Sequence, residues 1–288
     1  MTRASPPPEE SPRPSLHGAA RGDGRLRVRS GRFPWPLVVP ALVGLAFLVL
    51  PFAGLLARAP WPTLGTRLLM PEVRSALWLS LTTATAATAV AVLLGVPLAW
   101  LLARTDFPGR RVVRALVTVP LVIPPVVGGV ALLLALGRRG LVGRYLDEWF
   151  GLTLPFTSAA VVVAQVFVAM PFLVISVEGA LRGADRRYEE AAATLGASRA
   201  LVFRRVTLPM VAPGVLAGGV LAWARALGEF GATITFAGNF PGRTQTMPLA
   251  VYLAMQESPE SAIVLSLVLL GVSLVILIAL RDRWVGAV

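Results

Sequence analysis

A polar loop between two apolar spans contains Glu190-Ala191-Ala192, then Gly196, and then Val206-Thr207-Leu208-Pro209. Three residues lie between Ala192 and Gly196, and nine lie between Gly196 and Val206. The residues from 188 to 195 favour a short helix, and Gly196 has the freedom to adopt the left-handed conformation that ends it. Ser198 is placed to cap a second short helix, which we expect the proline to stop. Segment 185–209 is therefore predicted to be a helical hairpin whose small side chains let another protein approach its backbone closely.

The composition places most of the chain in a lipid environment. Of its 288 residues, 56% are hydrophobic, and the mean hydropathy is +0.72, whereas soluble domains are about 45–50% apolar. The net charge of +12 would suggest nucleic acid as the partner of a soluble protein. Here the arginines cluster beside apolar spans, which is typical of membrane topology. We therefore expect the lipid bilayer, and no nucleic acid, to surround the chain.

The residues that the sequence lacks exclude several kinds of chemistry. There is no cysteine, and the one histidine, His17, lies in a polar leader. Thiol nucleophiles, disulfides and histidine-based metal or acid–base sites are therefore unavailable. All 27 basic residues are arginine, and without lysine the chain cannot form an ordinary Walker A loop. We expect no catalytic residue, metal or cofactor in this chain, and any ATP that drives it must bind another chain.

Six apolar segments are close to or above the ~20 residues needed to cross a bilayer. They cover residues 36–57, 76–103, 112–136, 158–181, 211–237 and 261–280. The first exceeds the ~7–15 apolar residues of a signal peptide, which favours an uncleaved helix. We divide the chain into a disordered cytoplasmic leader (1–34), a first transmembrane helix with an outer loop (35–75), the main transmembrane domain (76–281) and a cytoplasmic tail (282–288). The predicted fold class is an all-α polytopic membrane protein with six transmembrane helices.

The arginine distribution orients these segments. With the leader inside, 19 arginines lie on the cytoplasmic side, seven lie in outer loops and Arg225 lies within a span. The positive-inside rule then places both termini and the 185–209 hairpin in the cytoplasm. Of the outer loops, 137–157 is expected to hold an interfacial helix, and 247–255 a re-entrant or surface helix too short to span.

Proline and glycine are concentrated in the third segment, at Pro120, Pro124, Pro125, Gly128 and Gly129. We expect them to bend or loosen this helix, although close packing of small residues explains them equally well. In the fourth segment Gln165 is a candidate buried polar residue of the kind that joins membrane helices.

Arg225 and Glu229 are the most costly residues in the fifth segment. They are four residues apart, so on a continuous helix they share a face with Thr233. An arginine at the centre of a membrane helix costs roughly 2.5–3.5 kcal/mol, and this face should therefore point into a protein or water-lined interior. The pair is either a structural ion pair or part of a translocation path in which Arg225 attracts an anion.

Two stretches resemble a known family. The spacing within 185–209 resembles the EAA loop of ABC importer permeases, with Val206 where that family usually has isoleucine. Residues 223–239 (WARALGEFGATITFAGN) and 241–250 (PGRTQTMPLA) resemble the sulfate/molybdate branch of type I ABC permeases, and within it the molybdate permease subunits most closely. The resemblance covers about residues 70 to 282 and implies the type I ABC importer permease fold.

The resemblance also implies partners and sites. It implies a homodimer in the cell membrane of a prokaryote, driven by a cytoplasmic ABC ATPase dimer and supplied by an extracytoplasmic oxyanion-binding protein. The ATPase-coupling residues would be Glu189, Glu190, Ala191, Ala192 and Gly196. The translocation path would use Arg225, Glu229, Thr233, Thr235 and Asn239, because arginine, hydroxyl and amide donors suit a tetrahedral dianion. Molybdate is the expected substrate, with tungstate, sulfate and phosphate as alternatives.

Two other classes of protein remain as alternatives. An ion-coupled secondary transporter needs paired broken helices or an acidic relay, but apart from Glu229 and the boundary residue Glu178 the spans are poor in carboxylates. A polytopic membrane enzyme would need serine, aspartate or glutamate chemistry, and the sequence places no pair of carboxylates in the membrane.

Overall fold

The computed structural model describes residues 35–285, so the predicted leader and the last three residues of the predicted tail lie outside the described residues. Within 35–285 the chain is helical and contains no strand. The elements, in chain order, are α1 (Trp35–Ala57), α2 (Trp61–Leu68), α3 (Pro71–Arg104), α4 (Arg110–Val122), α5 (Pro125–Leu136), α6 (Gly143–Phe150), α7 (Ser158–Gly183), α8 (Arg187–Thr194), α9 (Arg199–Val202), the π-helical turn η1 (Phe203–Thr207), α10 (Leu208–Leu227), α11 (Gly231–Phe236), α12 (Met247–Glu257) and α13 (Pro259–Val285).

The chain divides into two compact units, Met1–Pro51 and Phe52–Val288. The described residues of the first unit form the larger part of α1. Its apolar side chains, among them Leu42, Phe47 and Leu50, are exposed. An apolar helix with exposed side chains and internally satisfied backbone groups is suited to a lipid environment.

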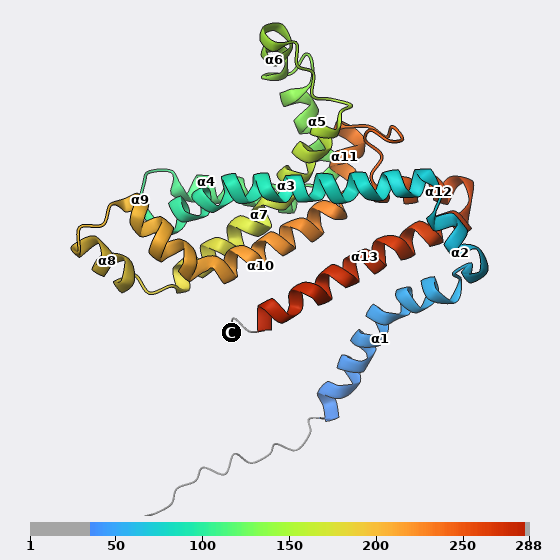
Figure 1. Ribbon diagram of the computed structural model, residues 1–288, viewed down its shortest axis with the longest axis horizontal. Coiled ribbons are helices and arrows are strands. Elements are labelled where there is room, and N and C mark those ends of the chain that lie inside the picture. Colours follow the sequence, from blue (N-terminus) through green and yellow to red (C-terminus); the bar gives the residue numbers. More distant parts are fainter. Residues whose placement is uncertain (1–34, 286–288) are drawn as a thin grey trace, which may run out of the picture. The chain divides into compact units, whose positions relative to one another are not determined.

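The second unit is built around three long helices. α3 packs along both α7 and α10, and α7 packs along α10 (Figure 1). Their contact is made largely by small residues, of which Ala84, Ala87 and Ala91 in α3 are completely buried. Small side chains allow membrane helices to approach closely, so this core uses van der Waals packing between backbones.

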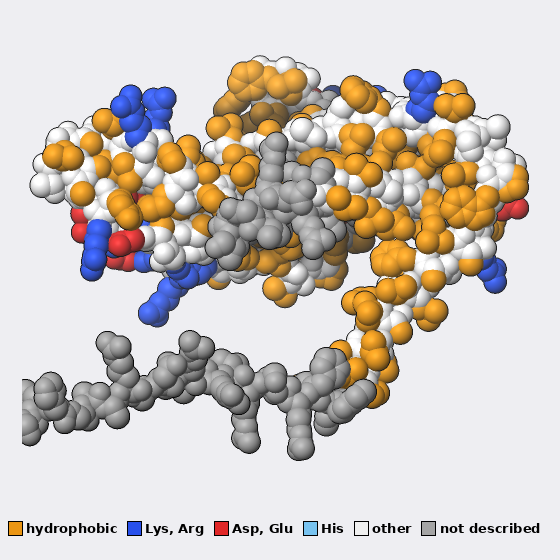
Figure 2. All heavy atoms as spheres, turned by 60° about the horizontal axis from the view of Figure 1, so that its bottom comes forward, with side chains coloured by type: hydrophobic (Ala, Val, Ile, Leu, Met, Phe, Trp, Pro, Cys, Tyr) orange, Lys and Arg blue, Asp and Glu red, His pale blue; other side chains and the backbone are white. Residues whose placement is uncertain are grey.

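Among the described residues, five helices are long and apolar enough to cross a membrane, and the bent pair α4–α5 makes a sixth if its two halves are counted as one span. The chain bends by 119° between α4 and α5. The predicted bend in this segment is therefore confirmed, and it falls at Pro124 and Pro125, where the proline rings interrupt the helical hydrogen bonds. Figure 2 shows apolar side chains over much of the visible surface, with arginines toward its ends.

The fifth predicted span ends earlier than expected. α10 ends at Leu227, and the separate helix α11 begins at Gly231. The carboxylate of Glu229 accepts a hydrogen bond from Ala232 N at 2.7 Å, which satisfies a free donor at the start of α11 and stabilises the break. The prediction of one helix over 211–237 was wrong, and Arg225, Glu229 and Thr233 do not share the face of a single helix.

The two broken segments pack against each other, because α11 lies along α5 (Figure 1). The approach is close. A Cβ atom on Gly129 would lie 2.8 Å from Ala232 O, and one on Gly231 would lie 2.9 Å from Pro125 Cβ. Glycine is therefore required at this contact.

The two loops that we predict to lie outside contain the short helices that the sequence predicts. α6 lies within 137–157, and α12, which packs on α13, covers 247–257. α6 is tied to the end of α5 by a hydrogen bond from Arg138 Nε to Asp147 Oδ2 at 2.8 Å, which raises the pKa of Arg138 above its usual value.

Candidate functional site

The coupling hairpin, which we define as residues 185–209, has the local structure expected of its sequence. α8 forms its first arm, and Gly196 adopts the left-handed conformation with φ of +84° just after it. Ser198 then caps α9, because its side-chain oxygen accepts a hydrogen bond from Leu201 N at 3.4 Å. The predicted helix, glycine turn and serine cap are confirmed.

The second arm does not end where the proline was expected to stop it. α9 continues through η1 into α10, and Arg199–Leu227 forms one long apolar run. In η1 the amide of Leu208 bonds to Phe203 O, five residues earlier, and Pro209 then falls in the first turn of α10. Because the run is continuous, Pro209 lies inside it, and the wider π turn before it accommodates a residue that lacks an N–H. The prediction that Pro209 stops the second helix was wrong.

One face of the hairpin is exposed. Glu190, Ala191 and Gly196 are all exposed, and no residue of the described helix α8 is buried. Two large apolar side chains extend this face, since Leu195 is 89% exposed and Tyr188 is 64% exposed. The sequence prediction did not include them, although an apolar residue in a polar loop was the available signal. These two side chains add exposed apolar area to the small residues of this face.

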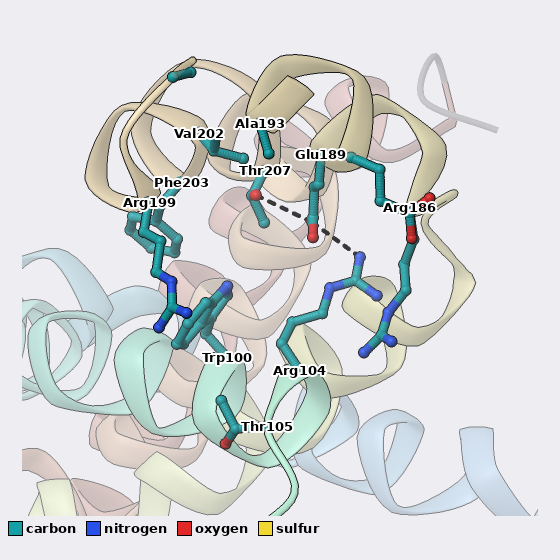
Figure 3. A pocket seen from close by; sticks show the side chains of 12 residues that line it. Trp100, Arg104, Thr105, Arg186, Glu189, Ala193, Arg199, Val202, Phe203 and Thr207 are labelled. Carbon is teal, nitrogen blue, oxygen red and sulfur yellow. Dashed lines mark hydrogen bonds and ion pairs between the residues drawn. The ribbon is translucent and has the colours of Figure 1, made fainter. Parts of the chain in front are cut away.

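Glu189 behaves differently from its neighbour Glu190. Its Oε1 accepts hydrogen bonds from Arg104 Nη2 and from Thr207 Oγ1, both at 3.0 Å (Figure 3). This cluster lies in a pocket of about 380 Å³ between the hairpin and the end of α3. Arg104 and Thr207 were not among the predicted site residues, because residues so distant in sequence are brought together only by the fold.

Glu178 forms a second cluster of charges. Its Oε1 accepts hydrogen bonds from Arg114 Nη2 at 2.7 Å and from Arg182 Nη2 at 2.6 Å. Arg114 also donates to the carbonyl of Leu102 at 3.4 Å. Glu178 is therefore a structural anchor that joins α7 to α4 and, through Arg114, to the end of α3.

The candidate path residues are only partly brought together. Arg225 Nη1 lies 2.6 Å from Glu229 Oε2, and the Arg225 side chain is 28% exposed, whereas that of Glu229 is 1% exposed. Thr235 Oγ1 donates to the backbone of its own helix, at Gly231 O. Thr233 Oγ1 and Asn239 Oδ1 are buried and have no hydrogen-bond partner among the described residues. Arg225 and Glu229 therefore form an ion pair, and Arg225 is its more exposed member.

Gln165 is buried in α7, as the sequence suggests. Neither polar atom of its side chain has a hydrogen-bond partner among residues 35–285. The expectation that it joins helices through a hydrogen bond is therefore not met within the described part of the chain.

Residues 91–287 match the family model described as binding-protein-dependent transport system inner membrane component. The molybdenum transport system permease protein ModB of Mycobacterium bovis is 49% identical over 245 residues, which cover 85% of this chain and 92% of that protein. ModB of Escherichia coli K12 is 41% identical, with 76% of this chain and 95% of that protein covered. The sulfate transport system permease protein CysT of Salmonella typhimurium is 34% identical, with coverage of 81% and 86%.

Solved structures share the fold at low sequence identity. A chain of a bacterial ABC transporter involved in the import of alginate has a TM-score of 0.67 at 18% identity, with 87% of this chain and 94% of that chain covered. A chain of the MetNI methionine ABC transporter has a TM-score of 0.58 at 19% identity, with coverage of 74% and 94%. The chain thus belongs to the binding-protein-dependent transport system inner membrane component family and is a permease subunit of an ABC importer.

Proposed function

We propose that this chain is the permease of an ATP-driven importer for a tetrahedral oxyanion, and that the oxyanion is molybdate. The observation that carries the proposal is the identity of 49% and 41% to two molybdenum transport permeases, compared with 34% to a sulfate permease, each over most of the chain. Tungstate and sulfate remain the alternatives, because these tetrahedral dianions differ mainly in size.

Two partners follow from this function. A cytoplasmic ABC ATPase dimer would dock on the exposed face of the coupling hairpin, where Glu190, Ala191, Ala192, Gly196 and the exposed Leu195 offer small and apolar contacts. An extracytoplasmic binding protein would deliver the oxyanion. A transporter of the same fold has been solved with a substrate-bound periplasmic protein, which supports the second partner.

We further propose that the subunit works as a homodimer with both termini in the cytoplasm. The division into 1–34, 35–75, 76–281 and 282–288 belongs to the same proposal. Closure of the ATPase dimer on ATP would move the hairpins, and the path would change from inward-open to outward-open. Such a change requires that the ATPase contact the two states of the permease differently.

The path would run past the break between α10 and α11. Arg225 offers positive charge there and is accessible, while the buried Glu229 holds its guanidinium in place. Thr233 Oγ1 and Asn239 Oδ1 follow this pair in the sequence, have no hydrogen-bond partner among the described residues and are therefore available for a ligand. The opposing interpretation is that the ion pair only stabilises the fold.

The variants Arg225→Ala and Arg225→Ala/Glu229→Gln distinguish these interpretations. The single change leaves a buried carboxylate without its cation, which is strongly destabilising, whereas the double change removes that charge. We expect the double variant to assemble normally and still to import poorly. Recovery of full uptake by the double variant would show that the pair is structural only.

The substrate is tested by uptake of radiolabelled molybdate into vesicles that carry the complete transporter. We expect unlabelled molybdate to compete far better than sulfate, with tungstate, the closest chemical analogue, between them or equal. Sulfate competing as well as molybdate would assign the chain to sulfate import.

A further inference from the structure

We propose that Glu189 is a positioning residue that fastens the coupling hairpin to the permease core, while Glu190 alone of the two adjacent carboxylates faces the ATPase. The inference rests on the proposed function, because it assigns separate tasks to two residues of the same hairpin. It removes Glu189 from the predicted contact surface and gives it the role of transmitting motion.

The geometry of the Glu189 carboxylate supports this role. Its Oε1 accepts both Arg104 Nη2 and Thr207 Oγ1 at 3.0 Å, and the side chains of Arg104 and Glu189 are only 6% and 18% exposed. Glu190 lines the same pocket but is exposed, and the hydrogen bonds and ion pairs of the described residues include the Glu189 carboxylate and not that of Glu190. In Figure 3 Glu189 lies between Thr207 and Arg104 on the inner side of the hairpin. Charged hydrogen bonds that are shielded from water are the strong ones.

The bonds of Glu189 join three elements at one point. Arg104 is the last residue of α3, and Thr207 is the last residue of η1, directly before α10. Since neither α8 nor α9 buries any of its described residues, apolar packing by these two helices contributes little to their attachment. The Arg104–Glu189–Thr207 cluster, which we name the hairpin latch, therefore holds α8 to the ends of two long helices.

The latch continues into the core through the end of α3. The carbonyl of Leu102, two residues before Arg104, accepts a hydrogen bond from Arg110 Nε of α4 at 2.8 Å. Arg114, also in α4, donates a hydrogen bond to Glu178 of α7. This ties α4 to α3 and α7.

α4 then leads through its bend into α5, which packs against α11 beside the Arg225–Glu229 pair. Contacts between packed elements thus connect the hairpin latch to the candidate path. The hairpin is also continuous with α10 through η1, so the latch adds a second connection to the path, from α8 through α3 and α4.

The test uses the complete transporter in vesicles, with Glu189→Ala, Glu189→Gln and the matched neighbour Glu190→Gln. Three quantities are measured: the affinity of the permease for its ATPase, the rate of ATP hydrolysis, and the oxyanion imported per ATP hydrolysed. We expect Glu189→Ala to keep its ATPase affinity and to lose at least about fivefold in oxyanion per ATP, which is the lower range of coupling between two sites. Glu189→Gln retains an acceptor oxygen and should lose less. Glu190→Gln should weaken ATPase binding and leave the ratio unchanged.

A distance measurement adds a readout that loss of folding would not mimic. The chain has no cysteine, so Asp106→Cys and Ala200→Cys introduce unique positions for spin labels beyond α3 and on α9. With the latch intact, the distribution of distances between the two labels should stay narrow with and without ATP. In Glu189→Gln the distribution should broaden when ATP binds.

Three outcomes would overturn the inference. They are an unchanged import ratio in both Glu189 variants, a loss of ATPase affinity in Glu189→Gln as large as that in Glu190→Gln, and an unaltered distance distribution. Failure of the wild-type chain to bind an ATPase would instead refute the proposed function.

Discussion

Replacement of Gly129 by alanine tests the closest contact in the structure, where α5 meets α11. The added Cβ atom would overlap with Thr235 Oγ1 and would lie 2.8 Å from Ala232 O and 2.9 Å from Ala232 Cα. The hydroxyl can rotate, but the backbone atoms cannot move alone. To restore a carbon contact of about 3.5 Å, α5 and α11 would have to separate by roughly 0.5 Å, which forfeits part of the dispersion energy along their interface.

The expected cost follows from these contacts. Overpacking costs about 1–3 kcal/mol, and rotation of Thr235 away from Gly231 O loses a hydrogen bond worth about 0.5–1.5 kcal/mol. We expect Gly129→Ala to lower the free energy of unfolding in detergent by about 2–4 kcal/mol. Uptake should fall as well, because α11 follows the break that carries Glu229.

The matched control is Gly179→Ala in α7, where an added Cβ atom meets no atom within 4 Å. There alanine should stabilise the helix by up to about 1 kcal/mol, through its higher helix propensity. Denaturant unfolding followed by circular dichroism measures both variants. Equal stability of Gly129→Ala and Gly179→Ala would refute the close packing of α5 on α11.

Two further predictions concern the Glu178 cluster and the coupling hairpin. Glu178→Gln keeps an oxygen acceptor but loses the charge that two arginines share, and it should lower the free energy of unfolding by about 1.5–3 kcal/mol. The control Asp106→Asn weakens an exposed pair with Arg110 and should change the free energy of unfolding by less than about 1 kcal/mol. Equal effects of the two variants would contradict the anchoring role of Glu178. Gly196→Ala places a side chain at φ of +84° and should lower the free energy of unfolding of the hairpin by about 1–2 kcal/mol, which hydrogen exchange would detect as faster amide exchange in residues 188–202. In the control Gly183→Ala the added side chain lies in open space at a residue without a positive φ, and the exchange in 188–202 should stay unchanged.

Much of the architecture could be predicted from the sequence, because apolar length and turn chemistry are local properties. Among the described residues, four of the five long apolar helices lie close to where hydropathy placed them, and the other, Arg199–Leu227, begins and ends earlier than the predicted span 211–237. The bend at Pro124 and Pro125 and the left-handed Gly196 follow from residue types whose backbone behaviour is nearly independent of context.

The errors arose where a distant or side-chain partner decides the backbone. The end of α10 at Leu227 depends on the Glu229 carboxylate bonding to Ala232 N, which periodicity does not reveal in an apolar run. Pro209 did not end its helix because the π turn before it rearranged the hydrogen bonds.

The site was predicted only in outline, for a related reason. Glu189 and Glu190 are chemically identical neighbours, and only the position of Arg104, 85 residues away, shows which one faces inward. Arg225 and Glu229 were paired correctly by their spacing of four residues, since that spacing still applies at the end of α10. The exposure of Leu195 likewise depends on the fold of the whole hairpin.

The central claim is that an ATPase acting on the coupling hairpin drives oxyanion movement through this chain. Its most direct test is oxyanion accumulation by proteoliposomes that contain this chain and the binding protein, measured with and without the ATPase and ATP. We expect accumulation only when the ATPase and ATP are both present. Accumulation at the same rate by liposomes that lack the ATPase would contradict the claim.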